Sequence, residues 1–209
     1  MPTASRRVIV GILLTATCAI GVGVAAGPAA AKPVVKVAYH VVGSSTIAKT
    51  NSVVQLGPTT LVTALNKDAT FTAKMPLPPT STSFKALGLL PVTADVTFAQ
   101  VGKVTGALLA KPHVHVRATS RYLIQLSNVQ VAGIPTPVGS QCETASPVTI
   151  KVATPKGTVF DLTKGGPLTG TYTIGNFQNC GLTTALINLL VPGPNNTVTL
   201  KLSHGHVVS

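Results

Sequence analysis

The sequence predicts an all-β protein: an antiparallel β-sandwich or β-barrel with one short helix at about 182–190, near the C-terminus. Three observations carry this prediction. Apolar and polar residues alternate with a period of two in short segments rich in Thr and Val. Clusters of Gly, Pro, Asn and Ser separate these segments. A helical period stands out in a single segment, and the chain beyond residue 31 lacks the long period of an α/β fold.

The strands are expected where the alternation is clearest. Phe71, Ala73 and Met75, for example, alternate with two threonines and a lysine, so one face of this segment is apolar and the other is polar. Turns rich in Pro or Gly, such as 76–79 and 165–167, bound the runs. In chain order, the expected strands are 70–75, 92–98, 114–118, 122–126, 148–152, 168–174 and 198–202.

One segment follows the period of a helix instead. Leu182, Leu186, Leu189 and Leu190 recur at helical spacing, and Pro192 then ends the pattern. The spacing predicts a short amphipathic helix of about two turns. Two roles are open for it: a plug that covers one end of the sandwich or barrel, or a lid over a hydrophobic cavity.

The first 31 residues have the anatomy of a secretory signal peptide. Arg6 and Arg7 provide a positive start, and the segment 8–26 is almost wholly apolar. The paired arginines also fit a twin-arginine signal, but the surrounding residues favour the Sec route. We therefore expect a secreted or cell-envelope-associated protein.

The expected cleavage site lies between Ala31 and Lys32. Ala29 and Ala31 occupy the small-residue positions that a signal peptidase requires. Cleavage leaves 32–209 as a single β-rich domain, with two related halves as an alternative organisation. A retained membrane anchor is the alternative fate of the apolar segment, although no retained transmembrane helix is expected.

Two cysteines, Cys142 and Cys180, follow the expected signal peptide. In the oxidising setting of an exported protein, their simplest arrangement is one disulfide that closes a loop of about 40 residues. Neither cysteine belongs to a C-x-x-C motif or has a histidine nearby, so a metal-binding or catalytic thiol is not favoured. We expect the bond to join the loop after Gly139 to the start of the helix.

The charge balance narrows the choice of partners. The chain has 16 Lys+Arg against 4 Asp+Glu, a formal net charge of +12 and a pI of about 10.1. The lysines are spread singly and only 4% of residues are aromatic, which argues against specific nucleic-acid recognition. Anionic envelope polymers or lipids are the expected partners. The alternative is a basic surface that only keeps an apolar chain soluble.

Residues for catalysis are few. His113 and His115 fall on one face of an expected strand, a spacing that copper and zinc sites use, and they are the candidate metal ligands; isolated solvent-facing histidines explain them as well. The four acidic residues are scattered, and no nucleophile-elbow motif occurs. The sequence therefore predicts no enzyme and no cofactor.

Five short segments carry a resemblance to known sequences. They read GSSTIAKT, LGLLPVTA, GPLTGTYTI, NCGL and LLVPGP, at 43–50, 87–94, 166–174, 179–182 and 189–194. Together they resemble uncharacterised exported proteins of actinobacteria. The resemblance covers most of the chain beyond residue 31 and implies export from a Gram-positive cell of high GC content. That group has no known function to transfer to any residue here.

Two classes of function follow from these observations. The first is a non-catalytic secreted or envelope-associated β-protein that binds surface polymers or other proteins. The second is a carrier of a lipid or isoprenoid, with a cavity closed by the helix at 182–190, as lipocalin-like isoprenoid-binding proteins are built.

Overall fold

Nearly all regular structure in the described part of the chain is β-strand. The computed structural model describes residues 35–110 and 113–209. The longer strands are β1 (Val35–Ile47), β2 (Ser52–Leu65), β3 (Thr70–Lys74), β4 (Thr80–Ala86), β5 (Leu90–Gln100), β6 (Val104–Leu109), β7 (His115–Val131), β10 (Val148–Ala153), β11 (Gly165–Ile174) and β13 (Gly193–Val208). The short elements are β8 (Ile134–Pro135), β9 (Glu143–Thr144), β12 (Phe177–Gln178), the 3-10 helix η1 (Gly181–Thr183) and the helix α1 (Thr184–Leu190).

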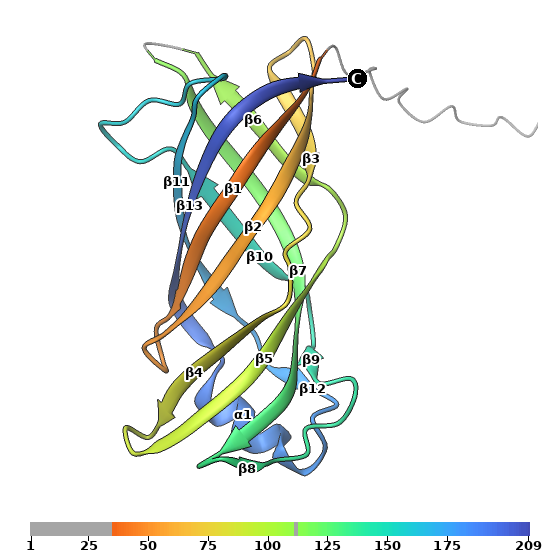
Figure 1. The fold of residues 1–209 in the computed structure, drawn as a ribbon, viewed down its shortest axis with the longest axis vertical. Coiled ribbons are helices and arrows are strands. Elements are labelled where there is room, and N and C mark those ends of the chain that lie inside the picture. The colour runs from red at the N-terminus through yellow and green to blue at the C-terminus, as the bar shows by residue number, and fades with distance from the viewer. Residues whose placement is uncertain (1–34, 111–112) are drawn as a thin grey trace, which may run out of the picture. The chain divides into compact units, whose positions relative to one another are not determined.

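The strands close into an antiparallel barrel (Figure 1). Within the described residues, β1, β2, β3, β6, β7, β10, β11 and β13 pair in this order. The pairing of β7 with β10, which sets Tyr122 opposite Val148, completes the ring. An eight-stranded barrel has an interior just wide enough to be filled by side chains or to hold one small ligand.

At two places around the ring, one strand position is filled by two shorter strands, one at each end of the barrel. β7 pairs with β6 through its first half and with β5 through its second half. β3 then pairs with β6, while β4 pairs with β5. The hydroxyl of Thr82 on β4 donates a hydrogen bond to the carbonyl of Val53 on β2, at 3.2 Å. One end of the barrel is therefore walled by β3 and β6, and the other by β4 and β5.

The predicted all-β class and the single short helix near the C-terminus are confirmed. The closure of the ring selects the barrel over the sandwich. The expected strands at 114–118 and 122–126 are one continuous strand, β7, because the chain stays extended through Ser120. The predicted signal peptide at 1–31, with its cleavage site between Ala31 and Lys32, lies outside the described residues.

The core of the protein is the inside of this barrel. Alternate residues of each strand point inward, as the pleat requires, and these are the apolar ones. On β5 and β7, for example, Ala94, Val96, Tyr122 and Ile124 are buried. Helix α1 lies at the end walled by β4 and β5 (Figure 1). The connection 154–164 between β10 and β11 lies at the opposite end, near the start of β7.

Candidate functional site

The interior of the barrel contains two apolar cavities. The helix-end cavity, of about 110 Å³, is lined by residues such as Val54, Ala94 and Leu126 and reaches α1. The loop-end cavity, of about 80 Å³, is lined by residues such as Leu61 and Ala118 and reaches the connection 154–164. Carbon atoms form almost the whole surface of both cavities.

A thin layer of side chains separates the two cavities. Leu56, Leu77, Ile150 and Val198 line both of them. These residues come from three strands and from the connection between β3 and β4, so they meet across the middle of the barrel. Aliphatic side chains of this kind move by changing rotamer, without breaking any hydrogen bond. The two cavities thus share four aliphatic lining side chains at the middle of the barrel.

The polar groups that face the helix-end cavity are satisfied within the protein. Ser45 Oγ lies 2.8 Å from the carbonyl of Thr197 and 2.6 Å from the hydroxyl of Tyr172. The carbonyl can only accept, so the single Ser45 proton goes to it and Tyr172 donates its own proton to Ser45. Burial raises the pKa of Tyr172, and the hydrogen bond with Ser45 opposes this only in part. The phenol therefore stays neutral, and the wall presents no charge to a ligand.

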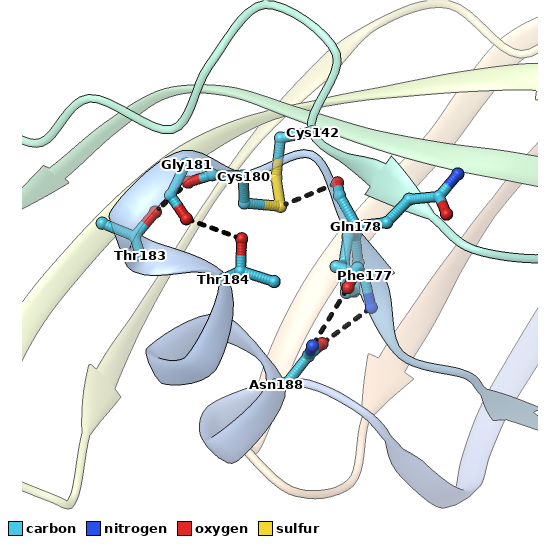
Figure 2. Close-up of a disulfide and its surroundings, with 8 residues drawn as sticks. All are labelled: Cys142, Phe177, Gln178, Cys180, Gly181, Thr183, Thr184 and Asn188. Carbon is cyan, nitrogen blue, oxygen red and sulfur yellow. Dashed lines mark hydrogen bonds between the residues drawn. A yellow bond between two sulfur atoms is a disulfide. The ribbon is translucent and has the colours of Figure 1, made fainter.

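Helix α1 closes the helix-end cavity with its inner face. Ile187 is buried, and Ile187 and Leu190 line the cavity. The side chain of Asn188 fixes the helix to β12: it accepts a hydrogen bond from Phe177 N at 2.7 Å and donates one to Phe177 O at 3.0 Å (Figure 2). The Asn188 amide thereby satisfies both main-chain groups of Phe177, as a neighbouring strand would.

A disulfide holds the start of the helical segment. Cys142 and Cys180 are bonded, with an S–S distance of 2.07 Å, and both are buried (Figure 2). Cys142 lies in the loop after Gly139, and its carbonyl accepts a hydrogen bond from Leu126 N of β7 at 2.9 Å. The predicted pairing of the cysteines and the predicted position of the helix are both confirmed.

The helix-end cavity opens beside one residue of α1. Leu186 lines the cavity and is also 45% exposed to solvent. The other described residues that line this cavity are buried or half-buried. We therefore assign the mouth of the helix-end cavity to Leu186; Leu162, 43% exposed, holds the same position at the loop-end cavity.

The opposite end is covered by the connection 154–164. Phe160 is buried there and packs edge-on against Tyr39, with 5.8 Å between ring centroids. The hydroxyl of Tyr39 donates to the carbonyl of Leu162 at 2.8 Å. Leu162 lines the loop-end cavity. This cover is held by non-covalent contacts, whereas a disulfide holds the helical segment at the other end.

The candidate metal ligands lie near the start of β7. His113 is exposed in the connection that precedes the strand, and His115 is half-buried at its first residue. In residues 35–110 and 113–209, no group of three or more His, Cys, Asp or Glu side chains is arranged to hold a metal ion. The structure therefore brings no third ligand to this pair.

Comparison with known proteins adds no relative: no protein-family model, curated protein or solved structure matches the chain. Within the part of the chain that the structure describes, no helix is both long enough and apolar enough to cross a membrane.

The sequence predicted the helix and the disulfide and left a cavity beneath the helix as an alternative, but it did not identify the residues that line the cavities. The lining residues come from strands that are far apart in the chain, and only the closure of the barrel brings them together. Asn188 and Ser45 also went unnoticed, because nothing local distinguishes them from the many other polar residues of turns and strands.

Proposed function

We propose that the protein is a non-catalytic carrier that binds an apolar ligand, of the lipid or isoprenoid class, inside its barrel. The observation that carries this proposal is the helix-end cavity, which is lined by carbon, free of charge and open at Leu186. Ligand sites are typically concave and apolar, with a few polar groups. The Ser45–Tyr172 pair is the polar feature of this wall.

The size of the cavities indicates a slender ligand. A dry apolar cavity of about 150 Å³ is known to hold a molecule as small as benzene. The helix-end cavity, at about 110 Å³, is of that order, and the loop-end cavity continues it beyond the dividing layer. An unbranched or isoprenoid chain could extend through both if Leu56 and Leu77 change rotamer. A polar head group would then remain at the mouth, next to Leu186.

The direct test is native mass spectrometry of the protein purified from the envelope of its own cells, without detergent. The proposal expects an added mass that organic solvent extracts and that fragments as a lipid. Protein that consistently carries no such mass, although the same cells contain the lipid pool, would contradict a carrier function.

A pair of matched variants locates the ligand. Ala94→Leu adds three carbons to the helix-end cavity, and Ala118→Leu adds the same three to the loop-end cavity. Benzene, whose binding is measured by ligand-detected nuclear magnetic resonance, should bind Ala94→Leu at least ~10-fold more weakly than the wild type, since the added volume takes up its space. Ala118→Leu should bind it almost as the wild type does. Denaturant unfolding of both variants checks that each is folded.

A second proposal is favoured by the charges at the opposite end of the barrel. Lys36, Lys67, Lys156 and Lys164 are exposed there. They suit the binding of an anionic envelope polymer, which is the first function expected from the sequence. Purified cell wall should retain the protein at low salt and release it at high salt, because salt screens exposed charges. Retention that does not change with salt would contradict this proposal.

A further inference from the structure

Five large apolar side chains project into solvent at the helix end of the barrel. Leu87 and Leu89 lie in the turn between β4 and β5, Ile134 begins β8, and Leu182 and Leu189 belong to the helical segment. Each is at least 60% exposed. These five residues are named here the apolar rim. A cluster of large apolar residues in water is uncommon on a monomeric protein and marks an interaction surface.

The members of the rim belong to one end of the molecule. Ala132 N donates to the carbonyl of Pro91 at 2.8 Å, which links the turn after β7 to the start of β5, next to the β4–β5 turn. Both turns and α1 lie at the same end of the barrel (Figure 1). Leu186, at the mouth of the helix-end cavity, is on α1 between Leu182 and Leu189. The apolar rim and Leu186 therefore lie at the same end of the barrel.

Helix α1 is apolar on more than the face it needs for packing. Ile187, on its inner face, is buried and packs against the barrel core. A surface helix ordinarily carries polar residues on its outer side. Here Leu189, on α1, is 60% exposed, and Leu182, in the preceding turn, is fully exposed. Because these two leucines are exposed, they contribute little to the stability of the free protein. Contact with a partner would explain why leucine stands at both positions.

Two lysines lie next to the rim. Lys85 is exposed two residues before Leu87, and Lys49 Nζ donates to the carbonyl of Pro192, just beyond α1, at 3.3 Å. Of the four acidic residues in the chain, Asp68 and Asp161 lie at the opposite end, and Asp95 on β5 and Glu143 on β9 lie in the half of the barrel that carries α1. Exposed leucines flanked by lysines match an anionic lipid surface, which offers an apolar interior below a negative head-group layer.

We propose that the apolar rim docks the barrel, helix end first, on an anionic lipid bilayer, so that the mouth at Leu186 faces the membrane. The choice of a bilayer over another partner rests on the proposed carrier function. A water-insoluble ligand that enters at Leu186 would then pass between membrane and cavity without crossing water. Lys49 and Lys85 would lie at the level of the lipid phosphates.

The test measures binding of the full chain to vesicles of phosphatidylcholine and phosphatidylglycerol. The double variant Leu89→Ser/Leu182→Ser removes two members of the rim. Its matched control, Val159→Ser/Val207→Ser, removes two exposed valines at the opposite end. We expect at least ~10-fold weaker vesicle binding for the first variant and less than ~2-fold change for the control. Because every variant carries the same N-terminal segment, a difference between them belongs to the rim. Equal binding of both variants would overturn the proposal.

Hydrogen exchange with and without vesicles supplies the orientation. Amides at 87–90, 132–134 and 181–190 should gain protection on vesicles, and those at 154–164 should not. The reverse pattern would show that the other end docks and would overturn the proposal. So would a dimer in the absence of vesicles that Leu89→Ser/Leu182→Ser converts to a monomer, since the rim would then bind a second copy.

The docking surface and the ligand cavity can be separated by the same measurements. Ala94→Leu should lose benzene binding and keep vesicle binding, because its change is buried. Leu89→Ser/Leu182→Ser should keep benzene binding and lose vesicle binding. Vesicle binding that survives when no lipid is found in the cavity would leave docking intact and reject the carrier function. Benzene binding with no vesicle binding would leave the cavity intact and reject docking.

Discussion

At the residue scale, glycine sets how closely two strands of the barrel approach each other. A Cβ built at Gly170 of β11 would lie 2.0 Å from the carbonyl oxygen of Lys151 on β10, which is far inside contact distance. Gly175, five residues later, has open space around its Cβ position. We expect Gly170→Ala to lower the free energy of unfolding by about 1–3 kcal/mol, since the strands must move apart. Gly175→Ala, measured in the same denaturant titration, should change it by less than ~0.5 kcal/mol.

A single carboxylate organises the turn over the loop end. The Asp161 side chain accepts hydrogen bonds from Lys164 N and from the hydroxyl and N–H of Thr163. These bonds, led by that from Lys164 N, lower the pKa of Asp161 to about 2. The unfolded chain has the ordinary value near 3.9. The stabilisation is therefore complete above pH 4 and is lost as the pH falls toward 2.

The carboxyl titration of Asp161 checks this directly, by nuclear magnetic resonance, with an expected midpoint near pH 2. Asp161→Asn keeps an acceptor oxygen but has no charge to lose. Its stability should therefore decline less steeply between pH 4 and pH 2 than that of the wild type. Parallel declines for the two proteins would show that Asp161 does not contribute.

At the scale of elements, the short helix depends on its attachments. A seven-residue helix is too short to persist alone in water, so α1 needs the disulfide, Asn188 and Ile187 to hold it. Its position was predictable, since the leucine spacing and Pro192 are local signals. Its attachment to β12 was not, because Phe177 and Asn188 form that contact through a turn with no local pattern of its own.

Removal of the disulfide should loosen the helical plug before the barrel. We expect Cys180→Ser to lower the free energy of unfolding by about 2–5 kcal/mol, because the unfolded chain regains the freedom of the closed loop. Hydrogen exchange should show the loss of protection first in α1 and η1, and only later in β7 and β13. The double variant Cys142→Ser/Cys180→Ser, which has no unpaired thiol at this site, should behave in the same way. Uniform loss of protection over all strands would contradict a local role for the bond.

β7, which was predicted as two strands, and β2, which was not predicted, show where a period of two fails. β7 was divided at Ser120, a buried polar residue in a position that an apolar one would fill. In β2, the buried residues have even numbers up to Leu56 and odd numbers from Leu61 onward. The change falls where the pairing with β1 is irregular, at Val41. A bulge of this kind moves every later side chain to the other face, so a strict alternation test no longer applies.

At the scale of the whole molecule, the closure of the barrel could not be predicted from the sequence. Alternation predicts that strands exist and which of their faces is apolar. The ring depends on pairings between distant segments, such as β1 with β13 and β7 with β10. Nothing local encodes these registers, so barrel and sandwich remained equally open. The residues that line the cavities come together only once the ring is closed, so they were unpredictable for the same reason.

The interior of the barrel makes the whole molecule sensitive to alkali. Tyr39, Tyr122 and Tyr172 are all buried, and burial raises the pKa of each. Tyr39 is raised further by the negative charge of Asp161. In the unfolded chain these phenols ionise near pH 10. Because the folded values are higher, the stability they provide is complete below pH 10 and falls as the pH rises above it.

We therefore expect the free energy of unfolding to decline above pH 10 by about 1.4 kcal/mol per pH unit for each tyrosine that ionises only on unfolding. Denaturant titrations between pH 9 and pH 12, followed by tyrosinate absorbance, measure this slope. Tyr122→Phe should be less stable at neutral pH, since it loses the 2.8 Å hydrogen bond to Met75 O, yet its stability should decline less steeply in alkali. The two proteins differ only in this hydroxyl, so the difference in slope isolates the buried phenol. Identical slopes would mean that the hydroxyl of Tyr122 reaches water, and that the barrel is open where the structure shows it closed.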